Sequence, residues 1–330
     1  MTKKRLDELI ARMEPRIAKR FRAVMARVKS RRTLAQIEAA IDSGATGQVI
    51  STVLDDIEAA AASVAGQTAA VQALVGGEVA DYLATKLDKL VSFDGSNPRV
   101  VAAAARNRYE LIQGLVEEQR QAIGEALRIG HELGLNPRQT AIAIRDSIGL
   151  TVEQTQWVAN YRRALERGSR KALAYELRDA RADRAVEGAI KAGKPLSPER
   201  IDKLVDRYAE RALKYRSEVI ARTEAHRNAN EAHDEAYEQT IENGHVDADR
   251  IQQKWLKGAR PRPWHNSMHG QLRKWGSPFR SGQGNPLKRP GDRDAPASET
   301  AQCNCGRAVR VLPPGQVAVD SDAEDVKQAA

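Results

Sequence analysis

The helical pattern that runs almost without interruption from residue 3 to residue 243 is the feature that most constrains the fold. Residues 34–130 are dominated by Ala, Leu, Val, Ile, Glu, Gln and Arg, and only Pro98 interrupts them. No alternating strand pattern appears before residue 245, and no internal repeat is found. The sequence therefore predicts a mainly α fold, with an elongated body of long helices and a small C-terminal module.

Helix start signals divide this pattern into separate helices. A side-chain cap before a proline, or a capping box, satisfies the free N–H groups of a first helical turn. An acidic residue in that turn also suits the helix dipole. The signals are Asn97-Pro98, Asn136-Pro137, Thr151-Val152-Glu153-Gln154 and Ser197-Pro198-Glu199.

The helix predicted from Ser197 to about Asn243 changes character halfway along. Its apolar stripe, which runs from Ile201 to Val219 at helical spacing, continues as a polar stripe. If that half were buried, its polar groups would need hydrogen-bond partners. The spacing instead favours a helix that leaves the core there and has a solvated face. The polar positions are Thr223, His226, Asn230, His233 and Tyr237.

Residues 3–32 predict a basic amphipathic helix. Its apolar stripe comprises Leu6, Leu9, Ile10, Met13, Ile17, Phe21, Val24 and Val28. We expect Pro15 to kink or restart this helix, because proline lacks an N–H and clashes with the preceding turn. Such a helix can lie on a membrane, along phosphates or against an acidic protein, and its stripe can equally pack on a neighbouring helix.

The net charge of +9 is concentrated in two parts of the chain. The N-terminal basic block, residues 1–35, and the C-terminal basic block, residues 251–310, each carry a net charge of +9. Residues 36–250 carry −6, and residues 311–330 carry −3. Blocks of like charge indicate contact with an anionic partner, although they also serve solubility alone.

The composition changes after residue 244. Residues 244–315 hold nine of the 23 glycines, eight of the 13 prolines and three of the four tryptophans. Gly and Pro at this density favour loops and short strands, and the tryptophans supply a core that disordered tails lack. We therefore expect a small α+β or irregular module that forms one domain, 197–315, with the long helix 197–243. The other segments are a basic amphipathic segment 1–35, a helical body 36–196 and an acidic flexible tail 316–330.

Four side chains of this module match the ligand types of a tetrahedral zinc ion. His265 and His269 lie four apart, and Cys303 and Cys305 lie two apart more than thirty residues later. A small module with a thin core also gains from a structural metal. One residue between the cysteines is fewer than zinc knuckles favour, so a virion-exposed or redox-active thiol pair and two inert thiols are alternatives.

The same segment permits a nuclease interpretation. His265 or His269 would act as acid or base, and nearby cations would hold a phosphate. No acidic pair or nucleophile accompanies them, and the sequence holds no phosphate-binding loop, nucleophile elbow or zinc-protease helix. Arginine-rich loops interleaved with tryptophan equally bind nucleic acid without cutting it. The cations are Arg260, Arg262, Arg273 and Lys274.

A series of motifs follows in order over residues 130–310. Its main positions are Arg222-Thr223-Glu224, Gly244, Trp255, Arg260, Arg262, His265, Gly270, Pro290-Gly291-Asp292, Cys303 and Cys305. This order resembles the phage head morphogenesis family, the Mu F-like minor capsid proteins. In that family an Ala-Arg-Thr-Glu helix precedes a glycine, a tryptophan, an R-x-R-x-x-H segment that ends in Gly, a Pro-Gly-Asp turn and a closing Cys-x-Cys.

Three positions depart from the family pattern. Ala259 and His269 stand where the family commonly has Asp, and Asn304 stands where it has Arg between the cysteines. The missing carboxylates weaken any catalytic or Asp-ligated metal role carried over from relatives. A metal-ligand role for His269 would be particular to this chain, so His265, Cys303 and Cys305 are the stronger candidates.

The resemblance implies a minor structural protein of a tailed-phage head. Such a protein associates with the portal and other head proteins and acts in head assembly and in DNA packaging or ejection. It resides in the virion, in the head interior or at the portal vertex, and in the host cytoplasm during assembly. No enzymatic activity is expected; the alternative is a phage nuclease or DNA-processing enzyme that uses residues 255–305.

The two basic blocks suit contact with packed DNA without sequence preference, which predicts binding that weakens steeply with salt. No run of about 18 apolar residues exists, so no membrane span is expected. A membrane-active ejected protein that uses helix 3–32 is a third interpretation. The predicted DNA contacts are Arg16, Lys19, Arg20, Arg27, Arg31, Arg32, Arg260, Arg262, Arg273 and Lys274.

Overall fold

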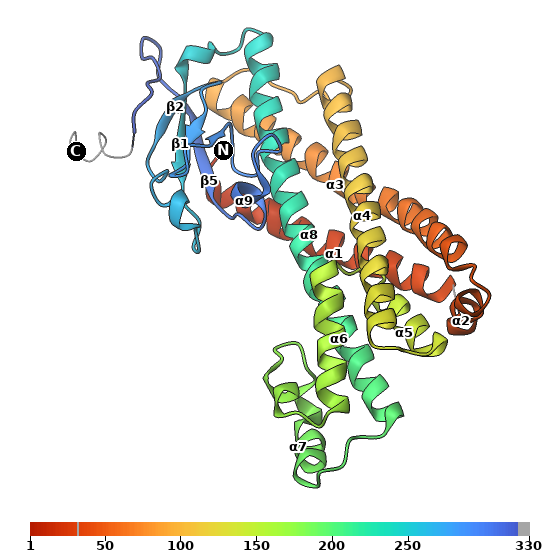
Figure 1. The fold of residues 1–330 in the computed structure, drawn as a ribbon. Helices are drawn as coiled ribbons and strands as arrows, with labels where there is room; N and C mark the ends of the chain where they lie inside the picture. The colour runs from red at the N-terminus through yellow and green to blue at the C-terminus, as the bar shows by residue number, and fades with distance from the viewer. Residues whose placement is uncertain (32, 323–330) are drawn as a thin grey trace. The chain divides into compact units, whose positions relative to one another are not determined.

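The fold is mainly α, as predicted (Figure 1). The computed structural model describes residues 1–31 and 33–322, so Arg32 lies outside the described residues. The α-helices are α1 (Lys3–Arg31), α2 (Leu34–Asp42), α3 (Thr46–Leu87), α4 (Pro98–Glu132), α5 (Pro137–Ser147), α6 (Val152–Glu166), α7 (Asp183–Lys191), α8 (Pro198–Glu242) and α9 (Ala297–Thr300). Short 3-10 helices are η1 (Arg170–Ala174), η2 (Ala180–Ala182), η3 (Ala248–Arg250) and η4 (Pro263–His265).

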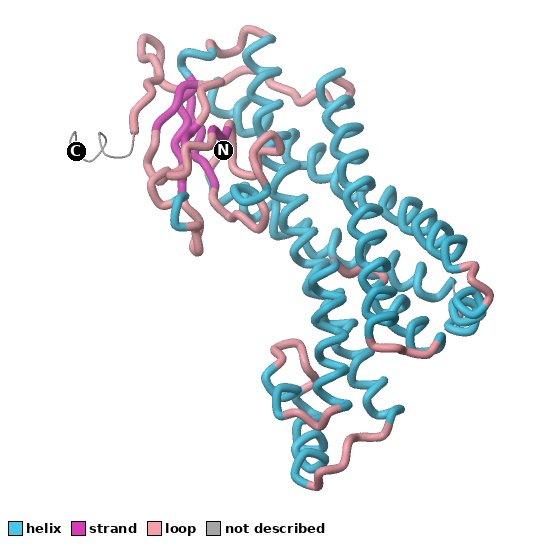
Figure 2. The backbone as a smooth tube through the Cα atoms, in the orientation of Figure 1, coloured by secondary structure: helices cyan, strands magenta, loops and turns pink. Residues whose placement is uncertain are grey.

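All strands of the described residues lie in the C-terminal module (Figure 2). They are β1 (Ile251–Leu256), β2 (Leu272–Lys274), β3 (Phe279–Arg280), β4 (Pro286–Leu287) and β5 (Gly306–Val311). An antiparallel three-stranded sheet has the order β2-β1-β5, and β3 pairs with β4. Trp255 on β1 lies opposite Arg307 on β5 and is fully buried with Met268 and Phe279. The module thus has the small core that its tryptophans predicted.

The predicted helix starts are confirmed. Each helix after a predicted cap begins where the sequence indicated, and two of the caps are capping boxes. In α6 the Thr151 hydroxyl accepts the Gln154 N–H, and the Gln154 side chain accepts the Thr151 N–H. Local hydrogen bonding of this kind depends only on neighbouring residues, which is why it is visible in the sequence.

Helix α1 runs through Pro15 without a restart. The expectation of a restart was therefore wrong. The predicted apolar stripe is buried on both sides of the proline, for example at Leu9, Ile17 and Phe21, each 0% exposed. Tertiary packing of an apolar face outweighs the one hydrogen bond that proline removes. In the described residues, none of the helices is both long enough and apolar enough to span a membrane.

The chain divides into two compact units that are interleaved along the sequence. Unit 1 comprises Met1–Ile17, Gly66–Arg106 and Val219–Ala330, and unit 2 comprises Ala18–Ala65 and Asn107–Glu218. The unit boundaries fall inside α1, α3, α4 and α8. This division differs from the four consecutive segments predicted from composition, because long helices carry no composition change where they pass from one unit to the other.

The polar half of α8 is buried, contrary to the expected solvated face. His226, Asn230 and His233 are between 0% and 6% exposed. The C-terminal module supplies distant partners: His226 Nε2 lies 2.9 Å from the Cys305 carbonyl oxygen, and the Tyr237 hydroxyl donates to the Val309 carbonyl at 3.3 Å. Buried polar groups require such partners, and no spacing rule predicts contacts more than 70 residues apart.

The predicted flexible tail is partly attached to the module. The Ala318 N–H donates to the Asp249 carbonyl, and Ser321 pairs with Leu272 through two backbone hydrogen bonds. Residues 318–321 therefore differ from the expectation of a frayed end, because the edge strand β2 offers unpaired backbone groups. Residues 323–330 lie outside the described part of the chain.

Candidate metal centre

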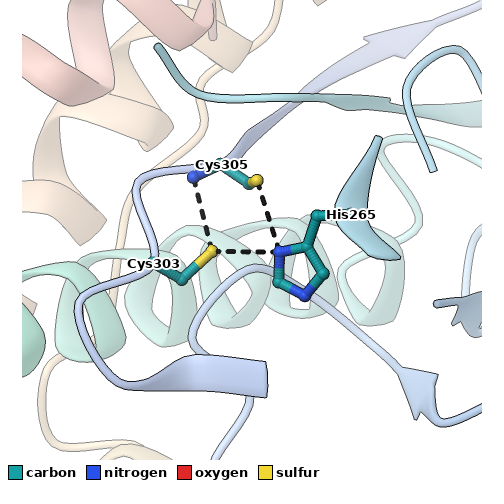
Figure 3. Close-up of side chains that lie close together, drawn as sticks. All are labelled: His265, Cys303 and Cys305. Atoms are coloured by element: carbon teal, nitrogen blue, oxygen red, sulfur yellow. Dashed lines mark hydrogen bonds between the residues drawn. The ribbon is translucent and has the colours of Figure 1, made fainter. Parts of the chain in front are cut away.

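The C-terminal module brings His265, Cys303 and Cys305 together (Figure 3). His265 ends η4, and the two cysteines lie in the loop between α9 and β5. Both sulfur atoms lie 3.6 Å from the same imidazole nitrogen, Nδ1. All three side chains are buried, and both cysteines are free thiols. One potential ligand atom from each residue thus lies within 4.8 Å of the others.

The two sulfur–nitrogen distances match those of a tetrahedral zinc site. Zn–S bonds of about 2.3 Å and a Zn–N bond of about 2.0–2.1 Å, at a tetrahedral angle, separate S from N by about 3.6 Å. Two thiols cannot both donate to Nδ1, because a neutral imidazole nitrogen has one lone pair. Burial lowers the pKa of His265, but hydrogen bonds with Cys305 and Glu299 outweigh burial and raise it, so the surroundings favour a positive charge here, on the ring or on a bound cation. A cation between the three atoms would satisfy all of them.

Glu299 on α9 fixes the orientation of the His265 ring. Its Oε2 accepts from His265 Nε2 at 2.7 Å and from Trp264 Nε1 at 2.8 Å, while Oε1 accepts from Ser281 Oγ and Asn285 Nδ2. Four donors thus occupy the acceptor sites of a carboxylate that is 0% exposed. The Nε2 proton is bound by this carboxylate, so Nδ1, which faces both sulfurs, is the nitrogen that would bind a metal, as in carboxylate–histidine–metal arrangements.

The electrostatics of Glu299 agree with an ionised carboxylate. Burial alone raises its pKa, but hydrogen bonds from Asn285, His265, Ser281 and Trp264 outweigh burial and hold the pKa below its usual value. The anionic carboxylate in turn favours positive charge on or beside the His265 ring. A metal ion at Nδ1 would supply such a charge.

The loop between α9 and β5 stabilises the thiolate of Cys305 and the thiol of Cys303. The pKa of Cys305 is lowered, first by the hydrogen bond with Cys303 and further by His265 and the Gly258 N–H, against the effect of burial, whereas the same hydrogen bond and burial raise the pKa of Cys303. The Cys305 N–H approaches Cys303 Sγ at 3.5 Å. Thiolate is the form of cysteine that binds metals. Gly258 has no room for a Cβ, which would collide with the Asn304 backbone, so this contact requires glycine.

Other motif residues support the cluster without contacting it. Arg262 donates to the Glu299 and Ala301 carbonyls on the chain that leads to Cys303. Thr223 Oγ1 on α8 accepts the Gln302 N–H at 3.4 Å. Of the residues that the family resemblance singled out, Thr223 and Arg262 thus bond to the segment that carries the cysteines.

His269 is not part of the cluster. Its side chain is exposed, and its Nδ1 accepts the Lys257 N–H at 3.3 Å. Its prediction as a fourth ligand was wrong, since a spacing of four places two residues together on a helix, whereas His265 is followed by a turn. The described residues therefore offer three protein ligands from this set.

The predicted DNA contacts fall into two groups. Arg16, Lys19, Arg20, Arg27 and Arg31 on α1 are exposed, as are Arg260 and Lys274 in the module. Arg262 is half-buried and bonded to carbonyls. Arg273 is 8% exposed and donates to the Pro278, Leu272 and Ser321 carbonyls, so it is not available to a phosphate.

No signal in the sequence marks Glu299 or its donors Ser281 and Asn285. They belong to no motif, and the carboxylate is separated from His265 by 34 residues. A buried carboxylate that orients a ligand is found only once the fold brings the two side chains together. Glu299 and its donors all lie within residues 244–315, but among the donors only Trp264, a tryptophan beside His265, belonged to the residue types that the composition had singled out.

Comparison with protein-family models, with curated proteins and with solved structures found no match for this chain.

Proposed function

We propose that this chain is a structural protein of a tailed-phage head whose C-terminal module is held together by a zinc ion at His265, Cys303 and Cys305. One observation carries the proposal: three motif residues of the resembled family, His265, Cys303 and Cys305, form a buried cluster with zinc-like sulfur–nitrogen distances. Two soft thiolates and one imidazole favour zinc over harder cations such as magnesium or calcium.

The burial of the cluster favours a structural ion over a catalytic one. A catalytic zinc site keeps a position open to substrate, whereas these three ligands are between 0% and 6% exposed. Because His265 engages Glu299 through Nε2 and faces the cysteines through Nδ1, neither nitrogen is presented to an external phosphate. These contacts also argue against the nuclease alternative, in which His265 would be the acid or base.

Metal analysis of the purified protein tests the zinc proposal. We expect close to one equivalent of zinc in the unaltered chain and in His269→Ala, which removes a histidine outside the cluster. Cys303→Ser should lose the ion. Folded protein without metal, or equal loss of zinc in His269→Ala, would contradict the proposal.

The structural role is tested by association with the portal. When the chain is co-expressed with the portal protein of the same phage, the two should co-purify, and the chain should occur in mature heads. A plasmid-nicking assay with magnesium or manganese should show no cleavage. Nicking that His265→Ala abolishes in a folded protein would overturn the structural assignment in favour of the nuclease.

DNA contact belongs to the same proposal. It is supported by the exposed cations of α1 and by Arg260 and Lys274, none of which is buried or bonded to a backbone carbonyl as Arg273 is. Binding should be independent of sequence and should weaken steeply with salt, because each neutralised phosphate releases counterions. Binding that does not change with salt would count against it.

A further inference from the structure

A hollow lined only by basic and uncharged side chains lies in unit 1, away from the metal centre. It has a volume of about 360 Å³ and its lining includes Tyr82, Lys86, Arg250, Arg310 and Pro313-Pro314. We call it the basic hollow. In the described part of the chain, no Asp or Glu lines it. None of these lining residues belongs to the motifs of the resembled family.

The local structure places Lys86, Arg250 and Arg310 around the basic hollow. Tyr82 and Lys86 lie one turn apart near the end of α3, so their side chains share one helix face. Arg310 lies on β5, opposite Gln252 on β1, and Arg250 ends η3 immediately before β1. The strand pairing therefore places Arg250 and Arg310 at the same end of the sheet.

The three cations of the basic hollow have donor groups available to bind an anion. Arg250 donates to the Leu312 carbonyl from Nε and Nη2, at 3.2 and 2.8 Å, which fixes its guanidinium and leaves Nη1 without a partner among the described residues. Neither Lys86 nor Arg310 forms an ion pair within that part of the chain, and both side chains are exposed. Cations without acidic neighbours attract anions most strongly.

We propose that the basic hollow binds one nucleotide of a single-stranded nucleic acid, with Lys86, Arg250 and Arg310 around its phosphate and the Tyr82 ring beside its base. The volume lies at the lower end of the range of small-ligand pockets, about 300–1,000 Å³, and exceeds what a bare phosphate needs. Cations that follow a backbone, next to an aromatic ring that accepts any base, are the elements of sequence-independent strand binding. This inference rests on the proposed DNA contacts of the chain.

Fluorescence anisotropy with a short labelled single-stranded DNA tests the inference. The double variant Lys86→Ala/Arg310→Ala should bind at least about tenfold more weakly at low salt, since two charged hydrogen bonds are removed. Its salt dependence should be shallower by about 1.4 in log–log slope, because each phosphate of a single strand that is neutralised contributes about 0.7. The matched control Lys194→Ala/Arg200→Ala removes the same charge from exposed positions in unit 2 and should bind as the unaltered chain does.

Tyr82→Leu separates the roles of the ring and the cations. It should weaken binding of single strands while leaving the salt slope and the binding of duplex DNA unchanged, because stacking involves no counterion. The substitutions at 86 and 310 replace exposed side chains, and thermal unfolding should confirm that the fold is retained.

Three results would overturn the inference. The first is unchanged single-strand binding in Lys86→Ala/Arg310→Ala. The second is loss of binding to phosphatidylserine vesicles in that variant without loss of DNA binding, which would indicate a lipid headgroup as ligand. The third is absence of single-strand binding by the unaltered chain; portal association would then still stand, so failure of the hollow and failure of the head assignment are distinguishable.

Discussion

The two basic blocks carry the same net charge of +9 but use it in different ways. In the N-terminal basic block Arg16, Arg20 and Arg27 are exposed on α1, opposite a buried apolar stripe, and Arg31 is exposed and pairs with Asp56. In the C-terminal basic block Arg273 and Arg307 are buried and bonded within the module. Net charge alone therefore does not identify a binding surface, because a guanidinium can also hold loops together through its five donors.

The C-terminal module explains the difference. It is rich in loops, whose backbone carbonyls need partners once they are buried. Arg273 and Arg262 donate to such carbonyls, and Arg293 pairs with Glu224 on α8 at 2.9 Å. In α1 the carbonyls bond within the helix, so its arginines are not needed for that purpose. These arginines of the module thus contribute to its folding, whereas Arg260, Lys274 and Arg310 remain exposed.

Removal of the metal should have the largest effect. A strong chelator should unfold the loop-rich module, because structural zinc contributes folding energy directly, and the helices of unit 2 should retain their signal. Circular dichroism in the far ultraviolet would follow the helices. Tryptophan fluorescence of a Trp157→Phe variant, whose three remaining tryptophans all lie in the module, would follow the module. Unchanged tryptophan fluorescence after complete zinc removal would contradict the assignment of a structural ion.

A buried carboxylate provides a test within unit 2. Burial raises the pKa of Asp146 to about 6, while Lys29 on α1 acts in the opposite direction. Since the folded state favours the protonated acid, its contribution to stability is complete below pH about 4 and is lost as the pH rises through 6. We expect about 3 kcal/mol less stability near pH 7 from this group.

The substitution Asp146→Asn should flatten that pH dependence of the free energy of unfolding. The exposed Asp55 provides the control, because Asp55→Asn should leave the profile as it is. Denaturant titrations between pH 4 and pH 7 would measure both. A steep profile that persists in Asp146→Asn would show that another group is responsible.

The substitution Glu299→Gln tests the carboxylate that orients His265. The amide keeps the size of the side chain but replaces one acceptor by a donor, so two of the four hydrogen bonds lose their acceptor. Zinc affinity should fall about 10- to 100-fold, the usual effect of removing such a partner. Competition with a chelating dye would measure it, and unchanged affinity would show that Glu299 plays no part in holding the ion.

The contrast between the two blocks is most direct for one arginine from each. Arg273→Met keeps the aliphatic stem but leaves buried carbonyls without donors, which should cost about 2–3 kcal/mol of unfolding free energy. Its effect on the salt dependence of DNA binding should be nil. An Arg273→Met protein with unchanged stability and weaker DNA binding would show that Arg273 contacts DNA and does not stabilise the module.

The exposed Arg27 should behave in the opposite way, with the smallest effect on stability. Arg27→Ala should change the free energy of unfolding by no more than about 0.5 kcal/mol. It should lower the salt slope for duplex DNA by about 0.9, which corresponds to one phosphate contact. Equal slopes in Arg27→Ala and the unaltered chain would remove α1 from the DNA-binding surface.

Local signals in the sequence were sufficient for most of the helices. Caps such as Thr151 with Gln154, and the stripe of α1 around Ile17 and Phe21, depend on residues within one or two turns. The same holds for the composition change after Gly244, which located the module. Pro15 was expected to kink or restart α1, and no restart occurs. Tertiary burial of the apolar stripe stabilises the helix on both sides of the proline.

The candidate site was predicted only in part. Residue chemistry selected His265, Cys303 and Cys305, but their burial and distances depend on contacts with α8 and α9. It also selected His269, whereas the fold places Glu299 on the opposite nitrogen of His265. The buried polar face of α8 was missed for the same reason, since His226 meets Cys305 across 79 residues of sequence. Long-range pairing of this kind leaves no periodicity in one sequence.

X-ray absorption at the zinc edge of the purified full-length chain is the most direct test of the metal centre. We predict about one equivalent of zinc, with two sulfur atoms at about 2.3 Å and a nitrogen of one imidazole at about 2.0–2.1 Å. Absence of sulfur from the first coordination sphere, or a folded chain that contains no metal, would contradict the zinc assignment.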